Sequence, residues 1–527
     1  MARTRASGIL LHPTSFPGGG GIGELGSRAY QWVDWLAAAG QSVWQILPLN
    51  PTGYGDSPYA SFSAFAGNPL LISLELLVQG GLLTAEETAQ GDDFPTDTVA
   101  FGAVIPWKFA LLRTAYERAV ENGTPELRAA FVQFCAEQGR WLDDYALFSA
   151  LKTAFDGKAW NEWDAPIRQR EAPALNEWRD KLGPEIQFQQ FLQFLFFTHW
   201  LRLKKYANDH GIRVFGDAPI FVAFDSADVW SQPEMFYLDE SGAPTVIAGV
   251  PPDYFSETGQ RWGNPLYRWD VQVEQGYAWW IERVRHTLTM LDVLRIDHFR
   301  GFEAYWEIPA TEPTAVKGRW VKGPGVALFH ALRQALPALP IVAEDLGVIT
   351  AEVEAIRDEM GFPGMKVLQF AWAGDNANAD LPHNHVPNSV VYTGTHDNDT
   401  TVGWYTQAGE IERAYFGAYT NDPGDHPAFE MLRLAWQSVS SLAIAPLQDV
   451  LQLGSETRMN YPGRESGNWG WRYDAAVLTP ELAAYLHNLS IVYGRTAPPP
   501  RELSTFEQRR EEQKHAATQM DAEDVAG

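Results

Sequence analysis

The sequence predicts an α/β protein built on a (β/α)8 barrel (a TIM barrel) with inserted, largely helical subdomains. Three observations favour this fold class. Short apolar runs rich in Val, Ile and Leu recur along the chain, and helical patterns lie between many of them. Runs of this kind suit strands that are buried on both faces, as in a parallel sheet. In addition, two of the connections are far longer than a βα unit needs.

Eight apolar runs are the candidate barrel strands. They cover residues 8–12, 43–49, 212–217, 293–299, 341–345, 365–370, 389–393 and 442–447. Clear helical spacing between them occurs at residues 29–39, 277–291, 325–336 and 351–360. Eight strands that alternate with helices indicate a (β/α)8 barrel, and a doubly wound sheet made of the same units is the alternative.

The two long connections are interpreted as insertions into a catalytic domain that spans residues 1–497. The first, at about 66–205, has helical patterns and predicts a helical subdomain. The second, at about 221–275, is rich in Pro, Gly and aromatic residues. A long connection of that composition is usually functional, so we expect a lid or substrate subdomain there. The charged stretch 498–527 is expected to be a mobile tail without a catalytic role.

Composition excludes several classes of partner. The 527 residues carry a formal net charge of −26, which argues against a nucleic acid or an anionic membrane surface. The single cysteine, Cys135, cannot form an intrachain disulfide or a cysteine-based metal site. The sequence shows neither a secretory signal nor an apolar run long enough to span a membrane. We therefore expect a cytoplasmic protein.

Acidic residues stand at or just past the ends of four candidate strands, namely Asp217, Asp297, Glu344 and Asp397. A barrel brings the carboxyl ends of its strands together on one rim, where the chemistry of such enzymes takes place. One acid at a strand end is explained equally well as a helix N-cap. Four acids on one rim would repel and shift one another's pKa values, which favours a functional site.

Two of these acids have surroundings that predict unequal roles. Arg295 precedes Asp297 by two residues, so both side chains share one face of the strand. A guanidinium there would keep Asp297 ionised, as a nucleophile requires, although a buried structural ion pair is the alternative. Glu344 follows an apolar lead-in, and burial beside the Asp297 anion would raise its pKa, as a general acid requires.

Histidines adjoin two of the acids, namely His298 after Asp297 and His396 before Asp397. They could bind a metal together with the carboxylates, but no ligand spacing typical of a metal site appears, so sugar hydroxyls are the favoured partners. The cluster GGGGIGELG at residues 18–26 invites a dinucleotide-binding interpretation. No following Lys-Ser/Thr and no acidic ribose partner support it, which favours a tight flexible loop.

Several aromatic residues lie in Gly- and Pro-rich loops, where core packing explains them less well. They are Tyr54, Tyr59, Tyr254, Phe255, Trp262, Trp469 and Trp471. A flat aromatic ring packs well against the apolar face of a glucose ring, and Tyr or Trp adds a polar edge. These loops are therefore candidate sugar-binding segments.

Long strings of the sequence resemble the 4-α-glucanotransferase family, also called amylomaltase or disproportionating enzyme (glycoside hydrolase family 77 of the α-amylase clan). The strings are SGILLHPTSFPGGGGIGELG, WQILPLNPTGYGDSPYASFSAFAGNP, GDAPIFVAFDSADVW, GVPPDYFSETGQRWGNPLY, LRIDHFRGF, VAEDLG and TGTHDNDT. The resemblance runs from about residue 7 to about residue 493. It implies a (β/α)8 barrel with inserted subdomains and without the C-terminal β-domain of the amylases.

The resemblance also implies a reaction and a set of site residues. The substrates would be α-1,4-glucans, and the reaction would be a retaining transfer to the 4-hydroxyl of an acceptor glucan, without a cofactor or metal. Asp297 would be the nucleophile, Glu344 the acid/base, and Asp397 the acid that grips sugar hydroxyls and stabilises the transition state. The residues placed around the substrate would be Tyr54, Ser57, Tyr59, Asp217, Tyr254, Gln260, Trp262, Arg295, His298, His396 and Asn468.

Two other functions remain possible at this point. An α-glucan hydrolase or debranching enzyme on the same barrel would use the same acids. A glucan-binding protein that has lost catalysis would lack one of the three carboxylates, and all three are present. A binding module also gains nothing from crowding acids together.

Overall fold

The computed structural model describes residues 5–252, 256–421 and 423–496. Eight parallel strands form its central sheet: β1 (Ala6–Leu10), β2 (Val43–Gln45), β3 (Arg213–Pro219), β6 (Val293–Asp297), β9 (Ile341–Ala343), β10 (Gly364–Val367), β11 (Ser389–Tyr392) and β12 (Leu442–Pro446). Each of the eight predicted runs contains or overlaps one of these strands. The tail 498–527 lies outside the described residues.

The central sheet is a nearly closed barrel. Its strand order follows the chain from β1 to β9 and from β10 to β12, and β12 pairs with β1 in register Ala6↔Leu442. Between the remaining edges, the Ala343 N–H donates a hydrogen bond of 2.9 Å to the Pro363 carbonyl just before β10. The predicted (β/α)8 fold is thus confirmed, and the doubly wound alternative is wrong because β12 returns to β1.

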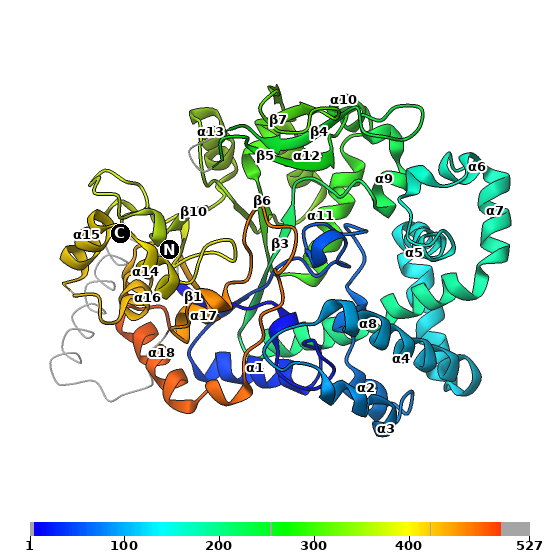
Figure 1. Ribbon diagram of the computed structural model, residues 1–527, viewed down its shortest axis with the longest axis horizontal. Coiled ribbons are helices and arrows are strands. Elements are labelled where there is room, and N and C mark those ends of the chain that lie inside the picture. Colours follow the sequence, from blue (N-terminus) through cyan, green and yellow to red (C-terminus); the bar gives the residue numbers. More distant parts are fainter. Residues whose placement is uncertain (1–4, 253–255, 422, 497–527) are drawn as a thin grey trace, which may run out of the picture.

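Helices surround the barrel (Figure 1), and an α-helix follows every central strand except β10, which short 3-10 helices connect to β11. The four predicted patterns correspond to α1 (Ser27–Ala38), α11 (Ala278–Met290), α12 (Val326–Ala335) and α13 (Ala351–Met360). Helix α1 shows why such a segment folds: Ala29, Trp32, Val33 and Leu36 are fully buried at the i, i+3, i+4, i+7 spacing of one helix face. The later helices are α14 (Thr401–Gln407), α15 (Glu410–Thr420), α16 (Pro427–Gln437), α17 (Leu447–Val450) and α18 (Pro480–Val492).

The connection between β2 and β3 is mainly helical. It holds α2 (Leu74–Gln79), α3 (Ala85–Thr88), α4 (Phe101–Asn122), α5 (Pro125–Ala154), α6 (Ala165–Arg168), α7 (Ala172–Lys181) and α8 (Gly183–Asp209). The long helices α5 and α8 pack through aromatic rings, among them Phe131 against Phe191 at 5.7 Å between centroids. In Figure 1 this helical insertion stands to one side of the barrel.

A second, antiparallel sheet is a feature that the sequence analysis did not predict. Its order is β5-β4-β7-β8, formed by β4 (Val246–Val250), β5 (Gln260–Pro265), β7 (Ala304–Pro309) and β8 (Arg319–Lys322). Two of these strands come from the connection after β3, which also holds α9 (Ala227–Ser231) and α10 (Trp269–Glu274). The other two follow β6. Region 221–275 therefore contributes strands as well as short helices, and in Figure 1 the second sheet lies above the barrel.

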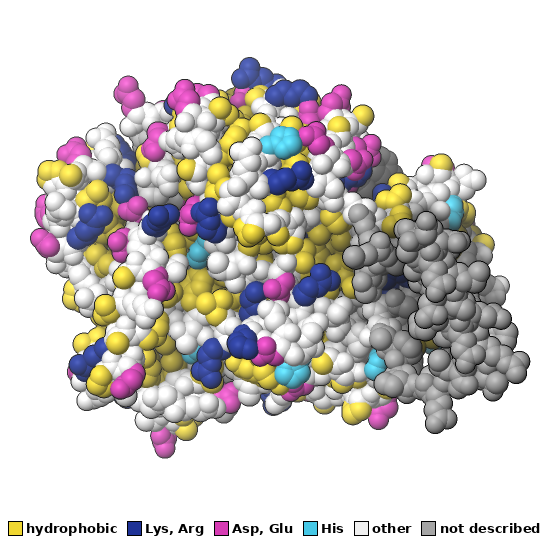
Figure 2. Space-filling model, turned by 180° about the vertical axis from the view of Figure 1, so that it is seen from behind, with side chains coloured by type: hydrophobic (Ala, Val, Ile, Leu, Met, Phe, Trp, Pro, Cys, Tyr) yellow, Lys and Arg dark blue, Asp and Glu magenta, His cyan; other side chains and the backbone are white. Residues whose placement is uncertain are grey.

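The surface agrees with the acidic but mixed composition. On the face shown in Figure 2, acidic and basic side chains are interspersed with apolar ones, and no continuous basic area covers the described part of that face. Across the described residues, no helix combines the length and the apolar character that a bilayer crossing demands.

Candidate active site

The four predicted acids do converge on the carboxyl ends of the barrel strands. Asp217 lies within β3, Asp297 is the last residue of β6, and Glu344 directly follows β9. Asp397 lies in the loop after β11. The parallel register of β3 and β6 places Asp217 beside Arg295, so the charged groups of adjacent strands meet in one row.

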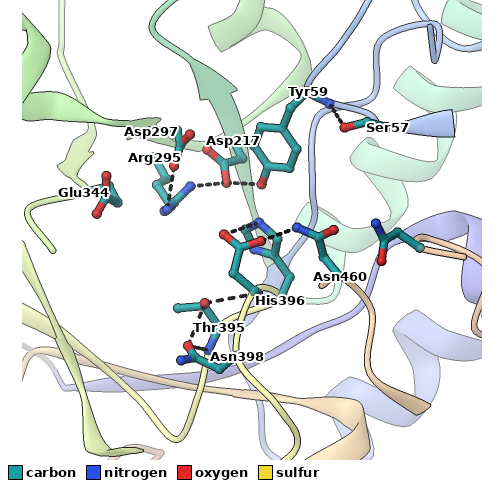
Figure 3. A network of polar contacts seen from close by, with 12 residues as sticks. Ser57, Tyr59, Asp217, Arg295, Asp297, Glu344, Thr395, His396, Asn398 and Asn460 are labelled. Atoms are coloured by element: carbon teal, nitrogen blue, oxygen red, sulfur yellow. Dashed lines mark hydrogen bonds and ion pairs between the residues drawn. The ribbon is translucent and has the colours of Figure 1, made fainter. Parts of the chain in front are cut away.

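Arg295 joins two of these carboxylates (Figure 3). Its side chain is buried, donates a hydrogen bond of 2.5 Å to Asp217 Oδ2 and forms an ion pair with Asp297 Oδ1 at 2.8 Å. The Tyr59 hydroxyl donates to the same Asp217 oxygen at 2.9 Å. Burial alone would lower the pKa of Arg295, but the two carboxylates outweigh it and raise that pKa. The guanidinium is therefore a permanent charge beside Asp297.

Glu344 has the opposite environment. Burial and the nearby Asp297 carboxylate raise the pKa of Glu344 to about 7. Arg295 and two backbone hydrogen bonds, from the N–H groups of His298 at 2.8 Å and Leu346 at 2.9 Å, act against this rise. This upward shift of the Glu344 pKa is in the direction that the apolar residues before Glu344 predict. At neutral pH this carboxyl group can therefore both donate and accept a proton.

His298 connects the two acids through the backbone. It follows Asp297 with φ 55°, in the left-handed region that a non-glycine residue seldom adopts. Its N–H is one of the donors to Glu344, and its ring packs edge-on against Trp262 at 4.8 Å between centroids. Burial lowers the pKa of His298 to about 4, so its imidazole is neutral at pH 7. Backbone conformations of this kind cluster at active sites.

Asp397 is held by a loop from a distant part of the chain. Asn460 Nδ2 donates to Asp397 Oδ1 at 2.6 Å, and His396 Nε2 lies 3.3 Å from Asp397 Oδ2. The Asp397 N–H donates to Thr395 Oγ1 at 3.3 Å, while Arg458 donates to the Asp397 carbonyl. Sequence reasoning missed Asn460, because nothing in its Gly- and Pro-containing surroundings links it to an acid 63 positions earlier.

A cleft of about 920 Å³ opens over these groups. Among the predicted residues, its walls include Tyr54, Ser57, Tyr59, Gln260, Trp262, Asp297, His298, His396 and Asp397. The Tyr59 ring stacks on the His396 ring at 5.2 Å with an interplanar angle of 12°, and Trp469 packs beside both. The cleft thus combines flat rings with polar groups at its floor, as a sugar site requires.

The remaining predicted residues occupy different positions. Asp217 and Arg295 lie buried beneath the cleft floor, and Tyr54 is 75% exposed at the rim, where its hydroxyl donates to Glu465. Asn468 is buried. Its side-chain Oδ1 accepts a hydrogen bond from the Tyr461 N–H, and its Nδ2 donates one to the Arg464 carbonyl of the same loop. The structure therefore places Asn468 behind the cleft wall as a loop-holding residue. Tyr254 falls outside the described residues.

Metal ligands do not assemble in the described part of the chain, where no three His, Cys, Asp or Glu side chains form a group that could hold an ion. The site consists instead of a carboxylate fixed beside a guanidinium, a second carboxyl group with a near-neutral pKa, and a third acid, Asp397, from the loop after β11. On the rim of a (β/α)8 barrel, this set defines an enzyme that acts on glycosidic bonds.

Comparison with known proteins makes the class specific. A family described as 4-alpha-glucanotransferase matches residues 11–478. The 4-alpha-glucanotransferase of Thermus thermophilus is 53% identical over 93% of this chain and 99% of its own, and that of Synechocystis sp. is 52% identical over 94% and 99%. The structure of an amylomaltase from Streptococcus agalactiae in complex with acarbose is 40% identical, with a TM-score of 0.91, covering 93% of this chain and 100% of that one. The chain belongs to the 4-alpha-glucanotransferase family.

The Asn460–Asp397 hydrogen bond yields a first prediction. Replacing Asn460 with Ala removes a hydrogen bond to a charged carboxylate, which is worth about 1.5–3 kcal/mol. We expect kcat/KM for the disproportionation of maltotriose to fall by about 10- to 100-fold. Asn376→Ala, at an exposed position outside the cleft, is the control and should leave kcat/KM unchanged. Equal rates in both variants would show that Asn460 does not orient Asp397.

Proposed function

We propose that this chain transfers a segment of an α-1,4-glucan to the 4-hydroxyl of an acceptor glucan or glucose, by a retaining double displacement on Asp297 and Glu344. The observation that carries this proposal is the contrast between the two acids. Asp297 is paired with Arg295 at 2.8 Å, whereas the pKa of Glu344 is raised to about 7. A retaining enzyme needs one ionised nucleophile and one protonated acid.

The first half of the reaction breaks the donor. Glu344 donates its proton to the glycosidic oxygen while an Asp297 oxygen attacks the anomeric carbon, so that the shortened glucan leaves with a free 4-hydroxyl. A covalent β-glucosyl ester on Asp297 results. This geometry calls for a separation of about 5–5.5 Å between the two carboxyl groups. In Figure 3 Asp297 lies against the Arg295 guanidinium and Glu344 lies to one side of both, and the two acids stand at the ends of the adjacent strands β6 and β9.

The second half rebuilds the bond. Glu344, now ionised, takes the proton from the 4-hydroxyl of an acceptor, whose oxygen attacks the anomeric carbon and displaces Asp297. Two inversions restore the α-1,4 link. Asp397, held by Asn460 at 2.6 Å, is positioned to accept hydrogen bonds from sugar hydroxyls and to stabilise positive charge at the transition state. No cofactor takes part in these steps.

The choice of a sugar over water depends on the cleft walls. Trp262, on β5, packs edge-on against the ring of His298, the residue after Asp297, and its Nε1 donates to Gln260 Oε1 at 3.1 Å. A large ring at this point excludes water from the covalent intermediate and offers a stacking surface to an acceptor. Transfer would then exceed hydrolysis.

The proposed roles are tested directly with pure maltotriose. The wild-type protein should produce glucose together with maltooligosaccharides longer than maltotriose, and NMR should show only α-linked products. Asp297→Asn should reduce this activity by at least about four orders of magnitude, because it removes the nucleophile and leaves the fold intact. Circular dichroism is the folding control. Substantial residual transfer by folded Asp297→Asn would remove Asp297 from this role.

The raised pKa of Glu344 predicts a pH dependence. The group must be protonated to act as an acid, so it works below its pKa and is lost as pH rises through about 7. For maltotriose, kcat/KM should therefore fall above about pH 7. Fluoride release from α-maltotriosyl fluoride, whose leaving group needs little protonation, should persist at higher pH. If kcat/KM falls in parallel for both donors, the loss of activity above about pH 7 is due to the titration of a group other than Glu344.

Trp262 provides a test of acceptor selection. In Trp262→Ala, water reaches the intermediate more easily, so the ratio of hydrolysis to transfer should rise several-fold. Trp320→Ala is a matched control, because Trp320 is similarly exposed, at 43% against 39% for Trp262, and lies outside the cleft lining. Chromatography of maltotriose products, with reducing ends counted separately, gives both rates. An unchanged ratio in Trp262→Ala would refute a role for this ring in excluding water.

A further inference from the structure

The active-site cleft is also lined by residues other than the acids and their direct partners. The same cavity that holds Asp297 and Asp397 is also lined by Phe62, Lys152, Gly157, Phe224 and Asp225, which we call the distal arm. Its residues come from three segments: the loop after β2, the connection after β3, and the end of α5 in the helical insertion. The mechanism on Asp297 and Glu344 uses none of them.

The distal arm is held rigidly. Lys152 Nζ donates to Asp225 Oδ2 at 2.6 Å and to the carbonyls of Gly157 and Lys158 at 2.6 and 2.9 Å. The turn that carries Phe224 and Asp225 is bonded to the insertion a second time through Trp160. The Trp160 N–H donates to Asp225 Oδ1 at 3.2 Å, and its Nε1 donates to the Phe224 carbonyl at 2.9 Å. A wall fixed in this way loses little entropy when a ligand binds.

The charges of the distal arm are internally satisfied. An ammonium group has three donors, and all three of those on Lys152 are engaged. Both carboxylate oxygens of Asp225 accept hydrogen bonds from the insertion. The arm therefore offers a phosphate or carboxylate no uncompensated charge. Its electrostatics suit an uncharged ligand.

Two aromatic rings give the distal arm its contact surface. Phe62 and Phe224 are both half-buried and line the cavity. Each is backed from behind, Phe224 by the Trp160 ring at 5.5 Å and Phe62 by the Phe148 ring at 6.4 Å. Phenylalanine has no polar edge, so these rings can bind only by packing. Rings presented in this way match the apolar face of a glucose unit.

We propose that the distal arm is a remote subsite that packs Phe62 and Phe224 against a glucose unit of a longer α-1,4-glucan, and thereby sets a preference for long over short chains. This inference rests on the proposed glucan transfer at Asp297. A chain that reaches from the acids to the distal arm gains stacking contacts at both ends of the cleft. A short chain gains only those at the acids. In Figure 1, α9, which follows the turn of Phe224, lies beside α5, so the helical insertion supplies this part of the cleft.

Phe224→Leu tests the proposal, because it removes the ring and keeps an apolar side chain. We expect kcat/KM for maltoheptaose to fall by about three- to ten-fold, the effect of losing one stacking contact. We expect kcat/KM for maltotriose to stay within about two-fold of wild type. Phe131→Leu is the matched control, since Phe131 is also half-buried in the insertion, packs against Phe191 and lies outside the cleft lining.

Phe62→Leu, on the opposite segment, provides a second variant with the same expected pattern if Phe224→Leu fails to fold. Equal losses for both substrates, or no loss for either, would overturn the remote subsite. Its failure is distinguishable from that of the proposed function. Wild-type protein that only hydrolyses maltotriose would refute the transfer mechanism, whereas the ratio of the two kcat/KM values measures the distal arm in either case.

Discussion

The arrangement of the site depends on one buried guanidinium. Arg295 lies between Asp217 and Asp297 with almost no access to solvent, where an unpaired charge would be prohibitively costly. The register of β3 and β6 brings the first carboxylate to it, and the strand itself brings the second. The Tyr59 hydroxyl donates a hydrogen bond to the same Asp217 oxygen, and this bond ties the loop after β2 to the site. The barrel rim, the proposed nucleophile Asp297 and one cleft wall are thereby held by the same set of contacts.

The chemical contrast between the two central acids follows from this arrangement. Arg295 forms a direct ion pair with Asp297, whereas at Glu344 it only opposes the rise in the pKa. Glu344 instead receives two backbone N–H groups, which are weaker than a full charge and do not overcome burial. Of two similar side chains on adjacent strands, one is thus paired with a fixed positive charge and the other has a raised pKa, and double displacement requires such a difference.

The sequence allowed the barrel and its acids to be predicted because both are local signals. Buried parallel strands are continuous apolar runs, and the acids at their ends are adjacent in sequence to those runs. The second sheet gives no such signal: β5 contains Gly263 and Pro265 and is mostly exposed, so it shows neither alternation nor an apolar run. Contacts between distant segments, such as Asn460 with Asp397, are equally invisible. The hydrogen bonds of the Asn468 amide to the backbone of its own loop are likewise not visible in the sequence.

The division between barrel and insertions also separates two aspects of the reaction. In the proposed mechanism the acids at the strand ends break a glycosidic bond with retention, and they act in the same way for water and for a sugar acceptor. Discrimination between acceptors must come from groups that touch the acceptor or exclude water. The groups proposed here lie on elements added to the barrel: Trp262, proposed to exclude water, is on β5, and Phe224, proposed to pack against a longer chain, is in the turn bonded to the helical insertion. A common barrel can therefore support hydrolases and transferases alike, with the outcome set by the shape and rigidity of the added walls.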